Sequence, residues 1–569
     1  MNRSLISRRS FVCLAGGMGA ALSSRPLFSG PAAGRVGVSG LLPLPRQLAQ
    51  VNTRDLRAAV ELGCRTMCRV FNPEDNNIPY FSARVWPEPR MWFSRAHSEA
   101  HVPGRHLNAL LSAESALGLT IPEDAIEHHA RAAFYSFSGP VPMPLNRQEL
   151  GGALRNFYPH NIREGLHAMY ALARFRGSEK ARDVAVKCIA MMSKYWSPER
   201  GWDRSYFVEK MGLVYSDGAA GSPFVAGIAR AIGPLVKYYK ATHHQPALDL
   251  AIVLKEKALA EYFLEDGSYS VARLGIHTHS ITCVLSSLAQ LYEVTGERLT
   301  LERVRAFFEN GLKELCDEIG WAVELTNNFA NQDRGEANCT GDILECCLIL
   351  GANGHPHYLG WTERILRCHL LPSQLRDVSF VPSASADATE DGRRNVAERL
   401  RGAWGFPAPY GHEPVEGTDL SFNLDIVGGV VGSLCEAYRQ VAVSGDTGHV
   451  VNMLFDHETK ALKIESPYPS GNLSVTVKEP APLSIRIPAW VDRDRLVCRR
   501  ASGAWSWQGD FLRVNDPFAG EKISVTFALK ETDLVLRHRP RAIRARVRGD
   551  EITAMENFEA PVTFFNSLS

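Results

Sequence analysis

The stretch "HSITCVLSSLAQLYEVTG", residues 279–296, decides the fold class. It starts with polar residues, is then apolar on nearly every face of a helix, and stops at Gly296, a residue type that commonly ends helices. A helix that is apolar on all sides is buried among other elements. Five other stretches have the same character: "PGRHLNALLSAESALGL" from 103, "NIREGLHAMYALARFRG" from 161, "PFVAGIARAIGPLVKYYKA" from 223, "CTGDILECCLILGANG" from 339 and "VGGVVGSLCEAYRQVAVSG" from 427.

Amphipathic helices, each with one polar face, are expected between these buried stretches. They cover residues 53–71, 123–137, 179–196, 245–263, 300–319 and 357–371. Alternation of six outer with six inner helices predicts a mainly α domain, an (α/α)6 toroid, over residues 45–445. A superhelical solenoid would also alternate its helices, but it would not need inner helices as apolar as these.

The hydrophobic period changes from 3.6 to 2 after residue 446. Short alternating runs such as "NLSVTVKE" (472–479) and "KISVTFAL" (522–529) are separated by Gly, Pro and Asp turns. This pattern predicts a C-terminal antiparallel β-sandwich over residues 446–569.

Composition excludes several function classes. The 569 residues are 45% hydrophobic and 22% charged, as in an ordinary soluble protein, and the net charge is +1. This balance favours neither nucleic acid nor an anionic membrane as a partner. No apolar run of membrane-spanning length follows the N-terminus, so no membrane span is expected.

The N-terminus resembles a twin-arginine export signal. Arg8 and Arg9 are followed by Ser10 and Phe11 and then by a weakly apolar stretch rich in Gly and Ala. We expect residues 1–34 to be a removed signal peptide and the protein to be periplasmic, secreted or membrane-attached. The alternative is a basic disordered tail.

The six inner helices run in the same direction, so the loops entering them meet at one mouth of the toroid. These loops carry polar side chains that are candidates for substrate binding, and the preceding segment 76–93 adds aromatic rings suited to stacking on sugars. The candidates are His101, Arg105, His160, Arg163, His277, His279, Glu336, Trp86 and Trp92. As alternatives, the polar residues would be helix caps and the aromatic segment a plug in the mouth.

Several stretches together resemble a known family. They include "HVPGRHLNALLSAE" (101–114), "EANCTGDILECCLIL" (336–350) and "LSIRIPAWV" (483–491), in that order. The chain is similar to the six-hairpin glycosidases, specifically to the β-L-arabinofuranosidase class of glycoside hydrolase family 127. The resemblance implies a toroid followed by a β-domain, and an exported glycoside hydrolase that acts on plant or algal polysaccharide fragments.

The resemblance also implies a zinc site that this chain does not keep. In the family, a Glu-x-Cys segment and a later Cys-Cys pair hold zinc, and one cysteine of the pair is the nucleophile. Here Glu336 and Cys339 match the first segment, but Asp425 and Ile426 stand at the positions of the pair. Two ligands rarely hold zinc, so we expect no cofactor; Glu336 and Cys339 are the metal candidates only if a zinc site survives.

A carboxylate mechanism is the remaining expectation. Glycoside hydrolysis needs a proton donor and a second group that attacks the sugar or activates water. The resemblance assigns the donor to Glu324, and Asp342 or Asp425 would be the second group. A polysaccharide lyase using His160 with Arg105 and Arg163, and a non-catalytic carbohydrate-binding relic, are the alternatives.

Overall fold

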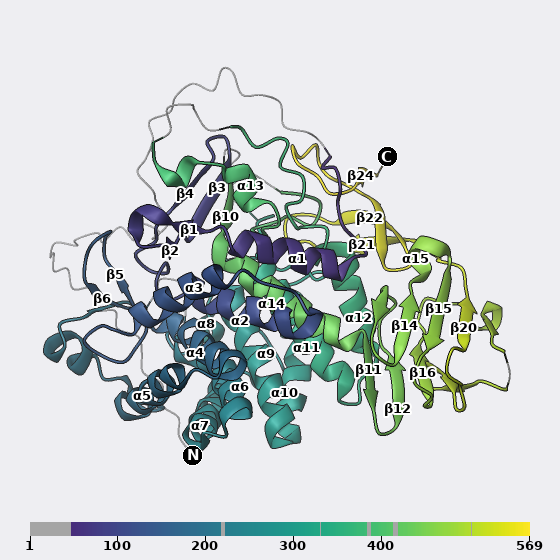
Figure 1. Cartoon of the computed structure of the whole chain (residues 1–569), viewed down its shortest axis with the longest axis horizontal. Helices are drawn as coiled ribbons and strands as arrows, with labels where there is room; N and C mark the ends of the chain where they lie inside the picture. Colours follow the sequence, from purple (N-terminus) through teal and green to yellow (C-terminus); the bar gives the residue numbers. More distant parts are fainter. Residues whose placement is uncertain are drawn as a thin grey trace, which may run out of the picture. The chain divides into compact units, whose positions relative to one another are not determined.

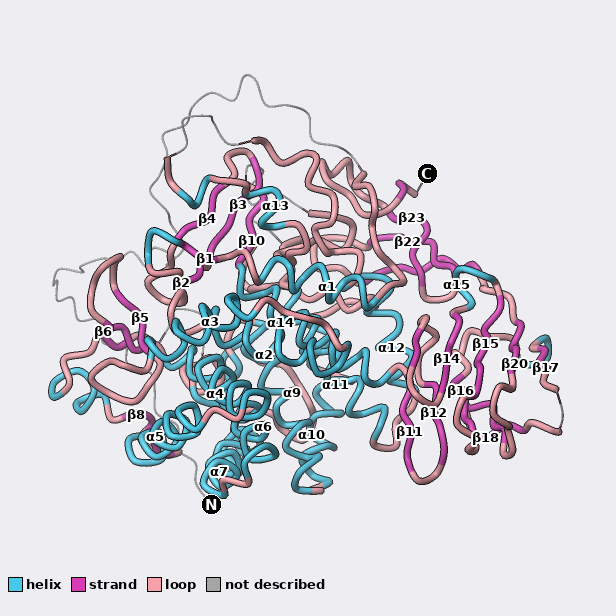
Figure 2. The backbone as a smooth tube through the Cα atoms, viewed as in Figure 1, coloured by secondary structure: helices cyan, strands magenta, loops and turns pink. Residues whose placement is uncertain are grey.

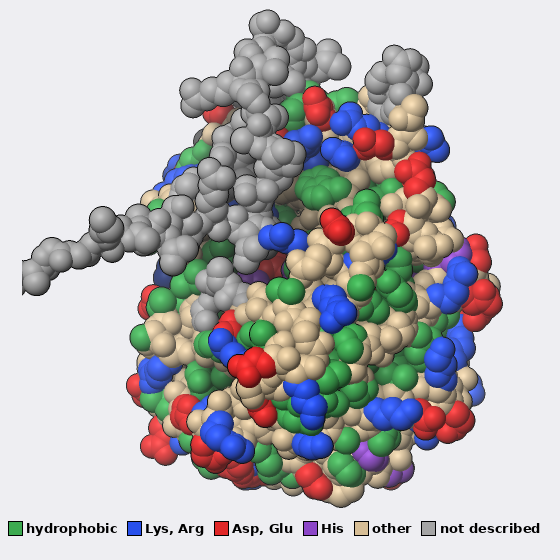
Figure 3. Space-filling view, turned by 90° about the vertical axis from the view of Figure 1, so that its left-hand side faces the viewer, with side chains coloured by type: hydrophobic (Ala, Val, Ile, Leu, Met, Phe, Trp, Pro, Cys, Tyr) green, Lys and Arg blue, Asp and Glu red, His purple; other side chains and the backbone are tan. Residues whose placement is uncertain are grey.

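The computed structural model describes residues 47–217, 222–329, 332–383, 389–412, 419–501 and 503–568 (Figure 1). The expected signal segment, residues 1–34, lies outside these ranges. In the described part, no helix is both long enough and apolar enough to cross a membrane. On the face that Figure 3 shows, Lys and Arg side chains are interspersed with Asp and Glu.

The helical domain alternates outer and inner helices as predicted. The inner helices are α2 (Val102–Leu117), α4 (Ile162–Arg176), α6 (Ile232–Thr242), α9 (Thr278–Thr295), α11 (Ala337–Ala352) and α14 (Leu424–Gln440). The outer helices are α1 (Leu56–Met67), α3 (Glu123–Ser136), α5 (Glu179–Tyr195), α7 (Gln245–Glu261), α10 (Arg298–Glu309) and α12 (His357–Ile365). Short helices α8 (Val271–Leu274), α13 (Val396–Leu400) and α15 (Pro467–Ser470) lie in connections.

The inner helices form a closed ring. Each packs on the next in chain order, and α14 packs back on α2. Glycines allow the closest approaches: a Cβ on Gly104 would lie 1.8 Å from the Glu164 carbonyl oxygen of α4, and one on Gly428 would lie 2.8 Å from the Arg105 carbonyl carbon of α2. The (α/α)6 toroid is therefore confirmed.

The two largest differences from the predicted helix boundaries are at α6 and α10. The third inner helix was expected from residue 223, but α6 starts at Ile232 after the 3-10 turn η4 (Ile228–Ala231). The stretch 300–319 was expected to be one helix, but α10 ends at Glu309 because the Gly311 amide bonds to the Gly267 carbonyl at 2.9 Å, outside the helix.

The C-terminal region contains two five-stranded sheets (Figure 2). One has the order β11 (Ala442–Gly445), β12 (Gly448–Val451), β16 (Leu483–Arg486), β19 (Phe511–Val514), β18 (Ser506–Gln508). The other has the order β13 (His457–Glu458), β14 (Leu462–Glu465), β15 (Asn472–Val477), β20 (Lys522–Thr526), β17 (Val497–Arg499). The prediction of purely antiparallel pairing was wrong at two places: β12 pairs with β16 in parallel, and β23 (Glu551–Met555) pairs with β24 (Asn566–Ser567) in parallel.

The described structure also contains smaller sheets. A four-stranded sheet contains β21 (Glu531–Leu536), β22 (Ile543–Arg548), β23 (Glu551–Met555) and β24 (Asn566–Ser567), the last two parallel. Three-stranded sheets join β10 (Leu420–Asn423), β3 (Ser82–Trp86) and β4 (Arg90–Trp92), and β5 (Leu145–Arg147), β6 (Leu154–Phe157) and β9 (Val214–Tyr215). Two hairpins pair β1 (Phe71–Asn72) with β2 (Ile78–Pro79) and β7 (Trp196–Ser197) with β8 (Gly201–Trp202).

A buried ionic cluster ties the toroid to the β-domain. Glu363 of α12 is fully buried and accepts hydrogen bonds from Arg367 at 3.2 Å and from Arg486 of β16 at 2.5 Å. The Arg367 guanidinium also donates to the Leu454 carbonyl at 2.8 Å and lies over the Phe455 ring. These groups satisfy one another's charge, which a buried ion pair requires.

Candidate functional site

A carboxylate surrounded by three guanidinium groups forms the centre of the site. The Oε1 atom of Glu164, near the start of α4, accepts hydrogen bonds from Arg105 at 3.1 Å, Arg163 at 3.2 Å and Arg230 at 2.8 Å. Burial raises the pKa of Glu164, but His101 and the three arginines outweigh burial and hold that pKa well below its usual range. Glu164 is therefore ionised and fixes the arginine side chains in place.

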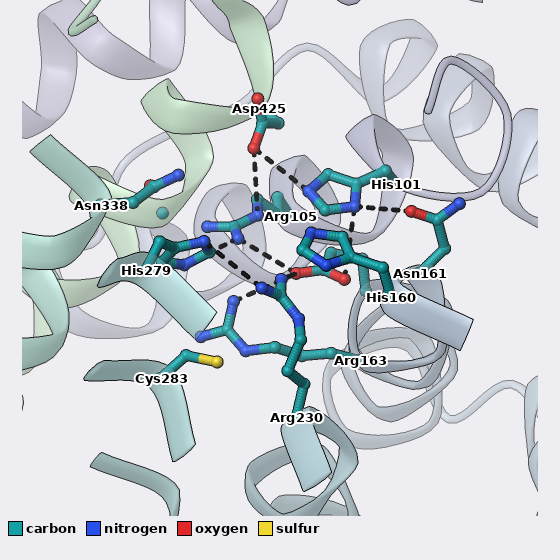
Figure 4. Close-up of polar contacts among 12 residues, drawn as sticks. His101, Arg105, His160, Asn161, Arg163, Arg230, His279, Cys283, Asn338 and Asp425 are labelled. Atoms are coloured by element: carbon teal, nitrogen blue, oxygen red, sulfur yellow. Dashed lines mark hydrogen bonds and ion pairs between the residues drawn. The ribbon is translucent and has the colours of Figure 1, made fainter. Parts of the chain in front are cut away.

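Asp425, at the start of α14, lies beside His101 and Arg105 (Figure 4). Its Oδ2 atom is 3.2 Å from His101 Nε2 and 3.4 Å from Arg105 Nε. Burial raises the pKa of Asp425, but the hydrogen bond with His101 and the charges of His101 and Arg105 lower it further, to about 2. Its Oδ1 atom is buried and has no hydrogen-bond partner among the described residues. Asp425 is thus an ionised carboxylate with one oxygen free.

A row of three histidines extends from Asp425. The His101 ring stacks on His160 at 5.5 Å between centroids, and His160 lies 5.7 Å from His277. His160 Nδ1 donates to the Ala226 carbonyl at 2.9 Å. Burial, together with Arg230, lowers the pKa of His160 well below its usual value, so this ring is neutral at neutral pH.

The two histidines of "GIHTHS", residues 275–280, meet Glu336. His277 Nε2 lies 3.6 Å from Glu336 Oε2, and His279 Nδ1 lies 3.7 Å from Glu336 Oε1. The ligand atoms of these three residues all lie within 4.8 Å of one another, so they are the described group best placed to hold a metal ion. Cys339 does not belong to this group, and burial raises the pKa of its thiol well above the usual value.

Asp342 lies deeper, on the second turn of α11. Its carboxylate contacts Thr282 Oγ1 at 3.0 Å, Arg163 at 3.4 Å and His279 Nε2 at 3.5 Å. It also lines a pocket together with Lys237. Burial raises the pKa of Asp342 to about 7 despite the opposing charge of Arg163. Asp342 belongs to the polar interior between the inner helices.

Glu324 lies on the loop that runs beside the start of α9. The Thr278 amide donates to the Glu324 carbonyl oxygen at 3.1 Å, and His277 and Leu325 form an isolated β-bridge. The Glu324 side chain is 14% exposed and its carboxylate is bonded to Arg334, whose guanidinium lies over Phe406. The Glu324 carboxylate is therefore held by an ion pair with a neighbouring loop residue.

The predicted aromatic platform is not formed as expected. Trp86 is 6% exposed and belongs to the hydrophobic core, where its strand β3 pairs with β10, so it does not present a ring face to a sugar. Trp92, at the end of β4, is 38% exposed and keeps a free surface. Trp321, near Glu324 in sequence, is also buried and donates its indole N–H to the Pro407 carbonyl at 2.7 Å.

Sequence reasoning missed Arg230, which comes from η4 before the third inner helix. Besides Glu164, it contacts His279 Nδ1 at 3.5 Å and Ser280 at 3.3 Å (Figure 4). The sequence feature that could have indicated Arg230 is an arginine inside the otherwise apolar stretch "PFVAGIARAIGPLVKYYKA". Asp217, on the loop that precedes this stretch, pairs with Arg204.

No protein-family model matches the sequence, and no curated protein matches it. Solved structures do match. A GH127 beta-L-arabinofuranosidase from Geobacillus stearothermophilus T6 is 12% identical with a TM-score of 0.51, covering 87% of this chain and 80% of that one. A GH127 beta-arabinofuranosidase is 14% identical with a TM-score of 0.52, covering 90% and 84%. At this identity the likeness shows a shared fold, which confirms the expected GH127-like architecture.

Proposed function

We propose that this protein is a glycoside hydrolase whose site is the mouth of the toroid. The observation that carries the proposal is the histidine row, His101, His160 and His277, which lies between the ionised Asp425 and the loop of Glu324. Hydrolysis of a glycosidic bond uses one carboxyl group as the acid and one as the base or nucleophile, and a carboxyl group borders this row at each end.

The two carboxyl groups have different roles in this proposal. Asp425, with its lowered pKa and free Oδ1 atom, is the carboxylate that activates water or attacks the sugar. Glu324 donates the proton to the leaving oxygen, because at 14% exposure its side chain is more accessible than those of Glu336 at 8%, Asp425 at 7% and Asp342 at 5%. Arg334, which is bonded to the Glu324 carboxylate, would fix its orientation.

The sequence supports an extracytoplasmic role. We propose export by the twin-arginine route, on the evidence of Arg8, Arg9 and Phe11, and a substrate among plant or algal polysaccharide fragments. His277, at 17% exposure, and the exposed ring of Trp92 are the candidates for contacts with the sugar.

A lyase at the same mouth is less well supported. It would need arginines free to neutralise a uronate carboxylate. Arg105 and Arg163 already pair with Glu164, and they also contact Asp425 and Asp342 respectively. Their charge is therefore balanced within the protein, which favours hydrolysis over elimination.

A product screen tests the proposal. The purified protein is incubated with neutral and uronate-containing polysaccharide fragments, and reducing ends and ultraviolet absorbance are followed. We expect new reducing ends without an unsaturated product, loss of activity in Asp425→Asn, and full activity in Asp249→Asn, which removes an exposed carboxylate on α7. An ultraviolet-absorbing product would establish a lyase, and binding without any product would establish a carbohydrate-binding relic.

A further inference from the structure

Three potential metal ligands meet where the fourth and fifth inner helices begin. His277 is the N-cap residue of α9, His279 lies in its first turn, and Glu336 is the N-cap residue of α11. Glu336 thus faces two imidazole rings from a different hairpin of the toroid. His279 and Glu336 are buried and His277 is half-buried, so the group lies at the edge of the mouth.

We propose that His277, His279 and Glu336 bind one divalent cation of the zinc class. Imidazole nitrogen and carboxylate oxygen are ligands that zinc accepts, with bond lengths of about 2.0–2.2 Å. Tetrahedral coordination at these lengths separates ligand atoms by roughly 3.3–3.6 Å. Glu336 Oε2 lies 3.6 Å from His277 Nε2 and Glu336 Oε1 lies 3.7 Å from His279 Nδ1, both close to that value, and all ligand atoms of the group lie within 4.8 Å of one another.

Neighbouring groups orient each ligand atom toward the common centre. His277 Nδ1 is hydrogen-bonded to Ser280 Oγ at 2.7 Å, which turns Nε2 toward Glu336. His279 Nε2 lies 3.1 Å from Arg105 Nη2 and 3.5 Å from Asp342, so these two groups occupy the Nε2 side of the ring and Nδ1 faces Glu336. Asn338 donates to Glu336 Oε1 at 3.1 Å. Such outer partners commonly fix the ligands of metal sites.

The surrounding charges accommodate a cation. Three guanidinium groups lie nearby, and each is paired with a carboxyl group of the protein: Arg230 with Glu164, Arg105 with Asp425 and Arg163 with Asp342. Arg230 is the guanidinium that competes at the proposed ligand atom, since its Nη1 atom lies 3.5 Å from His279 Nδ1, whereas Arg105 contacts the other ring nitrogen. Arg230 also bonds to Glu164 at 2.8 Å and to Ser280 at 3.3 Å, so it keeps its ion pair when His279 turns to a metal.

The proposed metal ligands differ from those expected from the sequence. The sequence-based expectation of no metal considered only Glu336 and Cys339, whereas the structure pairs Glu336 with two histidines. Three protein ligands leave at least one coordination position for water or a sugar hydroxyl, as in catalytic zinc sites. The proposed cation site does not depend on the proposed hydrolase activity.

Direct metal binding tests the inference. Untagged protein is freed of metal with a chelator and titrated with Co²⁺, followed by visible absorption, and its zinc content after Zn²⁺ loading is measured by elemental analysis. We expect one ion per chain. His277→Ala and Glu336→Gln should each weaken binding more than about 100-fold, and Ser280→Ala about 10–100-fold as an outer partner.

Two control variants make the result specific. The double variant His355→Ala/His357→Ala removes another histidine pair spaced two apart, with ring centroids 6.2 Å apart, and should bind normally. Cys339→Ser should also bind normally. The inference is overturned if folded wild-type protein, verified by circular dichroism, binds no ion. It is equally overturned if His277→Ala and Glu336→Gln bind as wild type, or if Cys339→Ser abolishes binding.

Discussion

The Nε2 atom of His101 lies 3.2 Å from the Oδ2 atom of Asp425, and this contact joins the first inner helix to the last. The two residues meet only because α14 packs back on α2 and closes the ring. The same contact lowers the pKa of Asp425 and keeps it ionised at neutral pH. Closure of the toroid therefore brings together the His101–Asp425 pair of the candidate site.

Glu363→Gln should destabilise the junction between the toroid and the β-domain. The change removes the only carboxylate bonded to both Arg367 and Arg486 in the described structure, and leaves two buried cations without compensation. Breaking a buried ion pair costs about 3–5 kcal/mol. Urea denaturation should show this loss.

The matched control is Glu88→Gln, which removes the exposed partner of Arg84. Its free energy of unfolding should stay within about 0.5 kcal/mol of wild type. Equal stability of the Glu363→Gln and Glu88→Gln proteins would show that the buried cluster does not stabilise the junction.

Asp317→Asn should make stability less dependent on pH. Burial raises the pKa of Asp317 to about 8, so between about pH 4 and pH 8 the folded protein holds a proton that the unfolded chain has released. Wild-type stability falls as pH rises through this window. Asp317→Asn lacks this pH-dependent contribution. Its free energy of unfolding relative to wild type should therefore rise by about 2–3 kcal/mol between about pH 5.5 and pH 7.5.

Urea denaturation at the two pH values measures that gain, with Asp249→Asn as an exposed control. Asparagine can keep the oxygen that accepts from the Ile319 and Trp321 amides, so the fold should survive. A constant stability difference between the Asp317→Asn and wild-type proteins at both pH values would refute the buried-proton interpretation.

Replacing Arg8 and Arg9 with lysine should leave the protein in the cytoplasm, since twin-arginine recognition depends on the arginine pair. Fractionation of cells that express each version, followed by immunoblotting, measures the distribution. Unchanged export of the lysine variant would remove the twin-arginine assignment.

The fold was predictable because buried helices have a recognisable local pattern of apolar residues in the sequence. Leu285, Leu288 and Leu291 of α9 are fully buried, and the all-round apolar pattern of residues 279–296 already indicated this. The start of the third inner helix was not predictable, because its apolar stretch continues without a break from a turn into the helix at Ile232. Periodicity alone does not separate the two conformations.

The candidate site was predictable only in part. His101, His279 and Asp425 do meet other entrance residues, since helix direction brings the entrances to one end. The partner of each residue depends on ring closure and side-chain direction, which the sequence does not contain. Arg230 was missed for this reason, and Trp86 was assigned to substrate although it completes the core.

The central claim is that Glu324 is the proton donor of a glycoside hydrolase. Turnover of two substrates with different leaving groups tests it most directly. On a natural substrate, Glu324→Gln should reduce turnover by about two to four orders of magnitude, the range for loss of a general acid. On a dinitrophenyl glycoside, whose leaving group needs no proton, the turnover of the variant should be largely restored. Equally slow turnover on both substrates, or wild-type turnover on the natural one, would contradict the account.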